Sequence, residues 1–375
     1  MNFLHISDLH LGLRLYEASL IDDQRYILEE IKKICEEKKV HALVIAGDIY
    51  DKGIPAAEAV ELFDEFLSYL MKKGIAVLSV AGNHDSGRRI SFGRKIMEKS
   101  GIYMEGIYKG TIKKAVFEDE YGKINFYLLP FIKPASVREY FPDADTFDKA
   151  VKAVIENENI NTEERNIMVS HQFVTGKGID VERSESETIY VGGVENVDAS
   201  AYRAFDYTAL GHIHKRQNIG KTIVYSGTPL KYSFSEASQT KTAVLVEIKE
   251  KGNINIENIP LKPMRDMRRV EGFLKDIEEN AADRDDYIYA VLKDENILNA
   301  MEKMREIYPN TLRLEFWQEK KITAEEERES LKGLGFGELF ERFFERQNGT
   351  KPNENEKNAA YEIYKKIGGE NNETS

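Results

Sequence analysis

The sequence is poor in cysteine and has no long apolar run, and both absences narrow the class of protein. Cys35 is the single cysteine among 375 residues, which excludes an intrachain disulfide framework. No segment approaches the roughly 18 consecutive apolar residues that a transmembrane helix needs. No basic, signal-like stretch precedes the first predicted strand. We therefore expect a cytoplasmic protein with no membrane partner.

Histidine is also scarce, and its distribution along the chain is uneven. Five of the seven histidines fall in short segments that end in potential metal ligands, and only His5 and His41 lie outside them. These segments are residues 8–10, 47–51, 82–85, 170–172 and 211–214. Most of them follow an apolar, β-branched run, a pattern typical of buried strands. The ligands should therefore lie in loops at strand ends, where open α/β sheets place their sites.

The donor types in these segments suit a pair of divalent metal ions. Carboxylates mixed with imidazoles and one amide are typical ligands of manganese, iron or zinc. Two such ions close together can activate a water and hold a phosphate oxygen. A single Asp-x-His arises by chance, and a lone histidine on a strand is more often a core residue. Five such segments in one chain make chance clustering improbable, so the pattern predicts a two-metal site.

The order of these motifs resembles a known superfamily. Asp-x-His, Gly-Asp-x-x-Asp, Gly-Asn-His-Asp, His and Gly-His-x-His follow one another across residues 8–214, as in the calcineurin-like metallophosphoesterases. Within this superfamily, the closer resemblance is to the SbcD-like nuclease subunits of SbcCD complexes. It rests on residues 6–12, 83–86 and 227–236. The resemblance covers nearly the whole chain. It implies an α/β fold, a four-layer α/β/β/α sandwich with a small α/β capping domain and C-terminal helices.

The resemblance also implies an activity. Such subunits are metal-dependent phosphodiesterases that act as double-strand DNA exonucleases and single-strand endonucleases. They process DNA ends and hairpins during repair, recombination and replication, together with an SbcC-type ABC ATPase. A phosphatase or phosphodiesterase of the same superfamily, acting on small or protein substrates, is the alternative enzyme class. A non-catalytic scaffold is a second alternative, which the complete set of ligand positions disfavours.

By motif position, the resemblance assigns two divalent ions, with Mn²⁺ expected, to seven ligands. One ion takes Asp8, His10, Asp48 and His214, and the other takes Asp48, Asn83, His171 and His212. His84 is not a ligand but stands beside the scissile phosphate as the catalytic residue. Asp51 occupies a position where archaeal relatives carry histidine, so no auxiliary role is carried over to it.

The chemistry of these residues is consistent with that assignment. Asp48 can bridge two ions because a carboxylate has two oxygens, whereas the amide of Asn83 limits the total ligand charge. His84 follows Asn83 directly, and its imidazole can pass a proton to the departing 3′-oxygen. Two interpretations of Asp85 are equally good: it orients His84, or it caps the helix that follows.

The charge balance argues against a protein that holds DNA alone. The formal net charge is −12 at pH 7, whereas DNA-binding proteins usually have a basic face. Local basic clusters nevertheless follow two of the motifs, with Arg88 and Arg89 in one and Lys215 in the other. These three are candidate DNA contacts, and ordinary solvated positions are the alternative. An acidic subunit that shares the binding of DNA with a partner protein fits this net charge best.

Five regions are expected along the chain. Residues 1–262 form the nuclease domain, 263–318 the capping domain, 319–334 a charged linker, 335–368 a helical partner-docking region and 369–375 a disordered tail. In the first region, hydrophobic periodicity predicts helices at 22–38, 55–73 and 145–157, and strands at 40–46, 111–117, 124–129, 166–170, 206–210, 222–225 and 242–248. In the second, it predicts helices at 271–280 and 297–307 and strands at 287–292 and 311–317.

Two surfaces are candidate protein interfaces. Leu339, Phe340, Phe343 and Phe344 form an aromatic stripe on a short helix, too small an element to bury them within itself. The resemblance implies that this region docks on the SbcC-type ATPase. It also implies a homodimer within a heterotetramer. The dimer would form through the segment 88–100 and the helix at 55–73, which has Leu62, Phe66 and Tyr69 on or beside its apolar stripe. The alternative is that this stripe simply covers the sheet.

Overall fold

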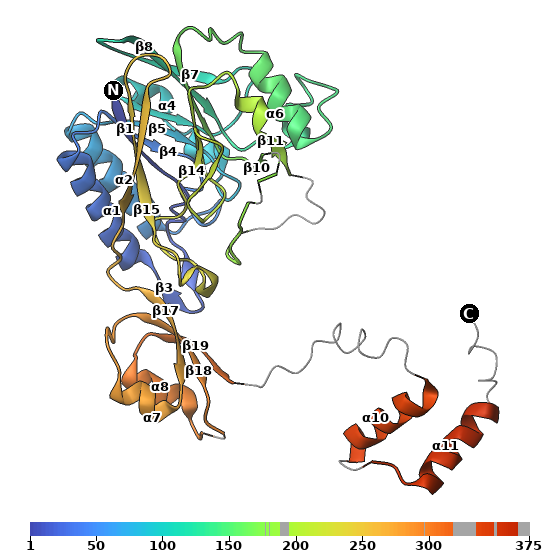
Figure 1. Ribbon diagram of the computed structural model, residues 1–375. Helices are drawn as coiled ribbons and strands as arrows, with labels where there is room; N and C mark the ends of the chain where they lie inside the picture. The colour runs from blue at the N-terminus through green and yellow to red at the C-terminus, as the bar shows by residue number, and fades with distance from the viewer. Residues whose placement is uncertain are drawn as a thin grey trace. The chain divides into compact units, whose positions relative to one another are not determined.

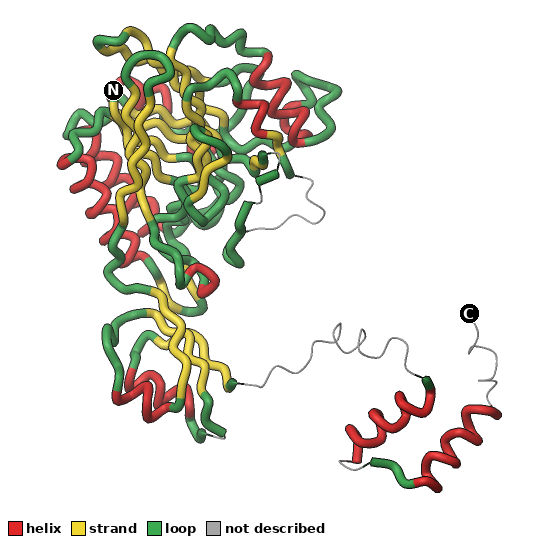
Figure 2. Tube along the Cα trace, in the orientation of Figure 1, coloured by secondary structure: helices red, strands yellow, loops and turns green. Residues whose placement is uncertain are grey.

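The computed structural model describes residues 1–176, 178–179, 181–187, 195–295, 297–317, 335–348 and 351–366. Its contacts divide the chain into two compact units, Met1–Phe316 and Trp317–Ser375. The first unit holds the two large sheets, and the second holds helices α10 and α11 (Figures 1 and 2). No helix among the described residues is long and apolar enough to span a bilayer.

The first large sheet has a parallel core and an antiparallel edge. Its strand order is β16-β15-β1-β4-β5-β6. The parallel strands are β1 (Asn2–Ile6), β4 (Ala42–Ile45), β5 (Ala76–Val80) and β6 (Ile102–Glu105), and the antiparallel strands are β15 (Thr242–Ile248) and β16 (Ile254–Pro260). Helices α1 (Ile21–Glu37) and α2 (Ala57–Lys72) cover its outer face.

The second large sheet is built in the same way. Its strand order is β13-β14-β12-β9-β8-β7. The parallel strands are β14 (Ile223–Tyr225), β12 (Tyr207–Leu210), β9 (Arg165–Ser170) and β8 (Gly122–Leu129), and the antiparallel edges are β13 (Gln217–Ile219) and β7 (Lys113–Asp119). Helix α6 (Phe147–Glu156) covers its outer face.

Three hydrophobic clusters define the layers of this fold. One cluster lies between α1, α2 and the first sheet, and another lies between α6 and the second sheet. The third joins the inner faces of the two sheets, with Phe3 and Val44 from one and Phe126 and Val169 from the other. Helix, sheet, sheet and helix therefore follow one another, and the predicted four-layer α/β/β/α sandwich is confirmed.

Helix α1 illustrates how the sequence pattern produces these layers. Ile27, Ile31 and Cys35 recur every four residues, so they share one face of the helix. All three are buried against the first sheet. Cys35 is therefore a packing residue, as its place on the apolar stripe predicts.

The shorter elements lie mostly in the loops between strands. They are β2 (Arg14–Leu15), β3 (Ala18–Ser19), β10 (Val174–Thr175), β11 (Val197–Asp198), α3 (Gly87–Ile90), α4 (Arg94–Met97), α5 (Pro134–Val137), and the 3₁₀ helices η1 (Glu98–Ser100), η2 (Ala199–Tyr202) and η3 (Phe234–Glu236).

Residues 267–316 form a smaller three-stranded parallel sheet with its own core. Its elements are β17 (Met267–Gly272), α7 (Leu274–Glu279), β18 (Tyr287–Leu292), α8 (Ala300–Ile307) and β19 (Thr311–Phe316). The prediction of a helix from residue 271 is wrong, because β17 occupies 267–272 and the helix starts at Leu274. β17 contains three charged residues, and the adjacent Arg268 and Arg269 interrupt the apolar alternation that would identify a strand.

A buried carboxylate ties this small sheet to the first layer of helices. Asp23 of α1 is 2% exposed. It accepts two hydrogen bonds from the guanidinium of Arg265, at 3.0 and 2.6 Å, and one from the hydroxyl of Tyr287 at 2.8 Å. Arg265 therefore serves a structural role.

The second unit is a pair of helices, α10 (Phe336–Asn348) and α11 (Glu354–Lys366). Phe336 stacks on Tyr364 with ring centres 4.0 Å apart, so the two helices share an aromatic contact. Leu339, Phe343 and Ile363 remain 38–62% exposed within this pair. The predicted linker at 319–334 and tail at 369–375 lie outside the described residues.

We predict that Arg165 is a major source of stability in the first unit. Its buried guanidinium bonds both oxygens of Asp119 at 2.5–3.2 Å and the carbonyl of Lys249 at 2.7 Å, which joins the two sheets at one end. Arg165→Met should lower the free energy of unfolding by about 2–4 kcal/mol, because it leaves these acceptors without their donor.

Urea denaturation followed by circular dichroism measures this loss. Arg203→Met, at an exposed position, is the control and should change stability by no more than about 0.5 kcal/mol. Equal stability of the two variants would show that the Arg165 contacts contribute nothing net.

Candidate metal centre

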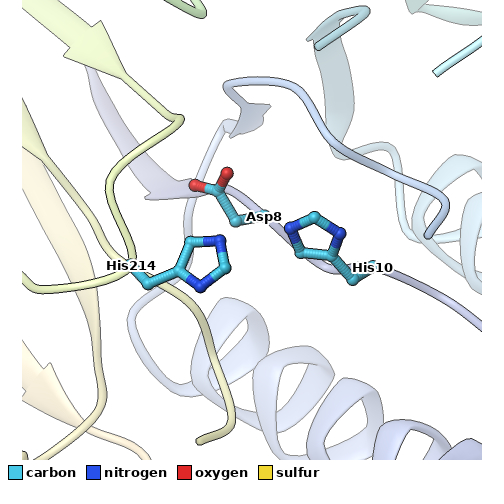
Figure 3. Close-up of side chains that lie close together, drawn as sticks. All are labelled: Asp8, His10 and His214. Atoms are coloured by element: carbon cyan, nitrogen blue, oxygen red, sulfur yellow. The ribbon is translucent and has the colours of Figure 1, made fainter. Parts of the chain in front are cut away.

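All seven predicted ligands lie in loops at the carboxyl ends of parallel strands. They are Asp8 and His10 after β1, Asp48 after β4, Asn83 after β5, His171 after β9, and His212 and His214 after β12. Because the strands of each sheet run parallel here and the two sheets are stacked, these loops meet at one edge of the sandwich. Figure 3 shows Asp8, His10 and His214 gathered together from two of the loops.

Three overlapping groups of side chains have the spacing of metal ligands. Within each group the candidate ligand atoms lie within 4.8 Å of one another. The groups are Asp8, His10 and His214; His10, Asp48 and His84; and Asp8, Asp48 and His171. Asp8, His10 and Asp48 each belong to two of them, so the three groups form one continuous cluster.

Asn83 and His212 extend this cluster on the His171 side. The side-chain oxygen of Asn83 lies 2.9 Å from Nδ1 of His212 and 3.0 Å from Nε2 of His171. Nε2 of His171 lies in turn 3.2 Å from a carboxylate oxygen of Asp48. The structure thus brings the seven predicted ligands together, with Asp48 between the two sets to which the resemblance assigned them.

Several ligands have a backbone conformation that is rare for residues other than glycine. Asp8, His10, Asp48 and His212 have φ angles of 53°, 44°, 49° and 94°. Such left-handed conformations cost free energy and persist where the surrounding structure imposes them, often at functional sites. Here they turn the chain sharply after a strand, which directs consecutive polar side chains into the same small volume.

Glycines allow the ligand loops to approach one another closely. A Cβ at position 82 would overlap the side chain of Asp48, and one at 211 would overlap the carbonyl of Ala46 and the ring of His171. The glycines that begin the third and fifth motifs, Gly82 and Gly211, therefore make room for the ligands of neighbouring loops.

Burial and mutual interaction shift the titration of these groups. Burial raises the pKa of Asp8, which is fully buried. Burial also opposes ionisation of Asp48, but the nearby imidazoles, His171 foremost, hold its pKa far below the ordinary value. Burial alone would lower the pKa of His171, yet the carboxylate of Asp48 raises it to about 9. The cluster thus holds buried charges that interact strongly.

The donor set fits divalent cations. Burial holds the pKa of His10 well below its ordinary value, so the ring is neutral. Its Nε2 atom is buried without a hydrogen-bond partner among the described residues and lies 3.8 Å from Asp48. A neutral imidazole nitrogen, two buried carboxylates and an amide oxygen together form the ligand set that manganese, iron or zinc accepts.

A second layer of side chains and carbonyls orients the imidazoles. Nδ1 of His171 lies 2.8 Å from the carbonyl of Ala46, which leaves Nε2 to face Asp48. Nδ1 of His214 lies 2.7 Å from the hydroxyl of Ser186, and that hydroxyl donates to Glu236 at 2.5 Å. Such outer contacts fix the tautomer and direction of ligating histidines.

Sequence reasoning did not identify these supporting residues. Glu195 is 2% exposed and lies 3.8 Å from Nε2 of His212. Glu236 is fully buried. Glu236 ends the 227–236 segment that carries the family resemblance, so its position held a usable signal. Ser186 and Glu195 lie in a stretch with no periodic pattern, and no signal in the sequence pointed to them.

His84 lies beside the cluster in a defined orientation. Its backbone N–H donates to Asp48 at 2.9 Å, and its Nδ1 lies 3.0 Å from the carbonyl of Asp51. The imidazole centres of His84 and His10 are 4.8 Å apart. A cavity of about 150 Å³ borders both rings. Because His84 also has ligand spacing to His10 and Asp48, its role as a proton donor stays a prediction.

Asp85 has a role that neither interpretation anticipated. Its carboxylate accepts hydrogen bonds from the backbone N–H groups of Ile49, Tyr50 and Gly82 at 2.9–3.1 Å. The residue at the N-cap of α3 is Ser86 and makes no side-chain cap. Burial, followed by the charge of Asp48, raises the pKa of Asp85 to about 6. Asp85 therefore ties the second motif loop to the third.

The candidate DNA contacts lie outside the ligand cluster. Arg88 and Arg89 are exposed in α3, directly after the third motif. Lys215 follows the last ligand and forms an ion pair with Glu182. Their contact with DNA stays a prediction.

Family models match most of the chain. Residues 1–216 match the model described as calcineurin-like phosphoesterase. Residues 263–348 match the model described as Type 5 capsule protein repressor C-terminal domain. A crystal structure of a dimetal phosphatase from Danio rerio covers 70% of this chain and 96% of its own, with a TM-score of 0.39 and 12% identity, a likeness too low to support an argument.

Curated relatives extend this match beyond the sandwich. The D subunit of the SbcCD nuclease from Staphylococcus epidermidis is 33% identical over 325 residues, which cover 84% of this chain and 85% of that protein. The corresponding protein from Staphylococcus saprophyticus is 34% identical over 325 residues and 84% of each chain. Together with the ligand cluster, these matches show that the chain belongs to the calcineurin-like phosphoesterase family, within the group of SbcCD nuclease D subunits.

Proposed function

We propose that this chain is a DNA exonuclease and endonuclease subunit that uses two divalent ions, with Mn²⁺ as the physiological metal. It would process DNA ends and hairpins in the cytoplasm, in repair, recombination and replication, together with an SbcC-type ABC ATPase. The convergence of seven ligands and His84 at one edge of the sandwich carries this proposal. The names of the relatives support DNA as the substrate and the ATPase as the partner.

The ligand cluster accounts for hydrolysis of a phosphodiester. Ions held there by Asp8, Asp48, Asn83 and the imidazoles would neutralise the phosphate and lower the pKa of an attacking water. Asp48 keeps its carboxylate ionised through the surrounding imidazoles. The carbonyl of Ala46 and the hydroxyl of Ser186 hold His171 and His214 in fixed directions. These contacts hold two of the proposed ligands in place.

His84 would complete the reaction by supplying a proton to the departing 3′-oxygen. The contact between its Nδ1 and the carbonyl of Asp51 fixes the orientation of the ring. General acid catalysis of this kind typically contributes a rate factor of about 10²–10⁴. The cavity that His84 shares with His10 and His214 gives the departing group a place beside the ligands.

We predict that His84→Ala abolishes cleavage without loss of metal. Wild-type protein with Mn²⁺ should degrade linear duplex DNA, and ATP with the partner ATPase should stimulate this activity. The variant should cleave at least about 100-fold more slowly and still bind two metal equivalents by elemental analysis.

His41→Ala is the matched control, because His41 is exposed and precedes the amino end of β4, the end opposite the ligand loops. It should retain full activity. Loss of one metal equivalent in His84→Ala would instead make His84 a ligand. A wild-type protein that hydrolyses phosphomonoesters but not DNA would overturn the proposed nuclease function.

A homodimer would have to use side chains other than Leu62 and Phe66 of the predicted stripe, whereas the half-buried Tyr69 stays a candidate. Leu62 and Phe66 are 3% and 0% exposed and pack in the core between α2 and the first sheet. The prediction that they form the interface is therefore wrong, since the stripe covers the sheet. In the segment 88–100, however, Phe92 and Ile96 are 83% and 75% exposed. We propose that these two side chains pair across a two-fold axis, which would bury both.

Replacing Phe92 and Ile96 together by glutamate should convert a dimer into a monomer, because charges would be buried in an apolar contact. Light scattering at micromolar concentration measures the change. Phe273→Glu, at another exposed aromatic, is the control and should leave the dimer intact. A monomeric wild-type protein under these conditions would rule out the dimer.

The second unit has exposed apolar side chains on α10 that are candidates for contact with the ATPase. Phe336 packs against Tyr364 within the helix pair. Leu339 and Phe343, one turn apart on α10, remain 38% and 61% exposed. Neighbouring apolar side chains on one helical face are typical anchors for a partner. We propose that they bind the SbcC-type ATPase, and that residues 263–318 act as the capping domain beside the DNA.

Leu339→Asp with Phe343→Asp should weaken binding to the partner ATPase at least about 100-fold, since each buried large side chain contributes roughly 1.5–3 kcal/mol. Calorimetry with purified partner measures the affinity. Glu338→Ala with Arg342→Ala, on the polar positions of the same helix, is the control. An unchanged affinity for the aspartate variant would place the partner contact elsewhere.

A further inference from the structure

A second and larger cavity borders the ligand cluster on its Asn83 side. Its volume is about 570 Å³, within the range of small-molecule sites. It lies between the third motif loop and the loop that precedes α5, and its lining includes Asn83, Arg88, Tyr108, Phe131 and Lys133. We call it the Asn83-side cavity. It shares none of its lining, among the described residues, with the cavity at His84.

The lining combines cationic side chains with aromatic rings. Phe131 stands at the boundary with the ligands, because its ring is stacked on His212 at a centre distance of 6.3 Å and an angle of 22°. The ammonium of Lys133 lies 6.0 Å from the centre of the same ring. Arg88 is exposed and forms no ion pair with any described residue. Aromatic faces beside cations are the elements that bind unpaired nucleotides.

The remaining polar groups of the lining are compatible with binding of an anionic ligand. Asp85 is the acidic residue there, but its carboxylate is engaged by three backbone N–H groups. Tyr108 is 6% exposed, and its hydroxyl has no hydrogen-bond partner among the described residues. The cavity thus offers donors and two cations, while its one carboxylate is already satisfied.

Backbone packing gives this cavity a fixed wall. Gly87 and Gly106 approach so closely that a Cβ on either would overlap the carbonyl of the other. The third motif loop is therefore held against the segment after β6. A preformed cavity binds a ligand with little ordering cost.

We propose that the Asn83-side cavity binds one unpaired deoxynucleotide, the one that keeps the scissile phosphate as its 5′-phosphate. The inference rests on the proposed nuclease function. In that reaction the water oxygen bonds to phosphorus, the bond from phosphorus to the 3′-oxygen breaks, and His84 supplies a proton to that oxygen. The nucleotide that loses the phosphate lies at the His84 cavity, and its neighbour lies at the Asn83-side cavity.

Binding of thymidine 5′-monophosphate to the full-length protein tests this assignment. Calorimetry is performed with chelator and again with Mn²⁺, and thymidine 3′-monophosphate and inorganic phosphate serve as comparison ligands. Arg88→Ala combined with Lys133→Ala should weaken binding of the 5′-monophosphate about tenfold or more, because two charge-assisted contacts are lost. Arg138→Ala, exposed just after α5, is the control and should change affinity less than about twofold.

Each outcome bears on one proposal. Tighter binding of the 5′- than of the 3′-monophosphate, lost in the double variant and kept in the control, supports the cavity as a nucleotide site. Equal binding of inorganic phosphate, or no effect of the double variant, overturns it. Failure of wild-type protein to cleave DNA would overturn the nuclease function instead, because nucleotide binding is measured without cleavage.

Discussion

The burial of two carboxylates, Asp8 and Asp48, is the constraint on which the site depends. Both are almost inaccessible to water, and charges removed from water require compensating partners. The imidazoles around them supply part of this compensation, and divalent cations would supply the rest. The left-handed turns after β1 and β4 and the close approaches at Gly82 and Gly211 are the backbone features that make such a dense cluster possible.

A buried network connects this cluster to the rest of the sandwich. Glu236 accepts from Ser186, which contacts His214, and it also accepts from the buried ammonium of Lys241 at 2.5 Å. Lys241 donates in addition to the carbonyl of His214 at 3.0 Å. Replacement of one member would leave another buried and unpaired. The 227–236 segment thus supports the predicted ligand His214 through Glu236.

The architecture separates chemistry from recognition. The ligands belong to the parallel cores of the two large sheets, which are held by three apolar clusters. The cavities beside them are lined largely by loops, and the proposed partner contacts Leu339 and Phe343 lie in the second unit. Rigid strands therefore position the predicted ligands, whereas the proposed substrate and partner contacts lie on elements that tolerate variation.

The sequence by itself determined the layered fold and the strands that precede the predicted ligands, because local hydrophobic periodicity and motif order record these features directly. It missed β17, whose exposed charges blur its alternation, and it placed Leu62 and Phe66 at an interface. Only the tertiary structure decided which face of α2 the sheet buries, that Asp85 joins two loops, and that Ser186, Glu195 and Glu236 support the histidines. Those contacts join residues distant in the chain, and no local pattern encodes them.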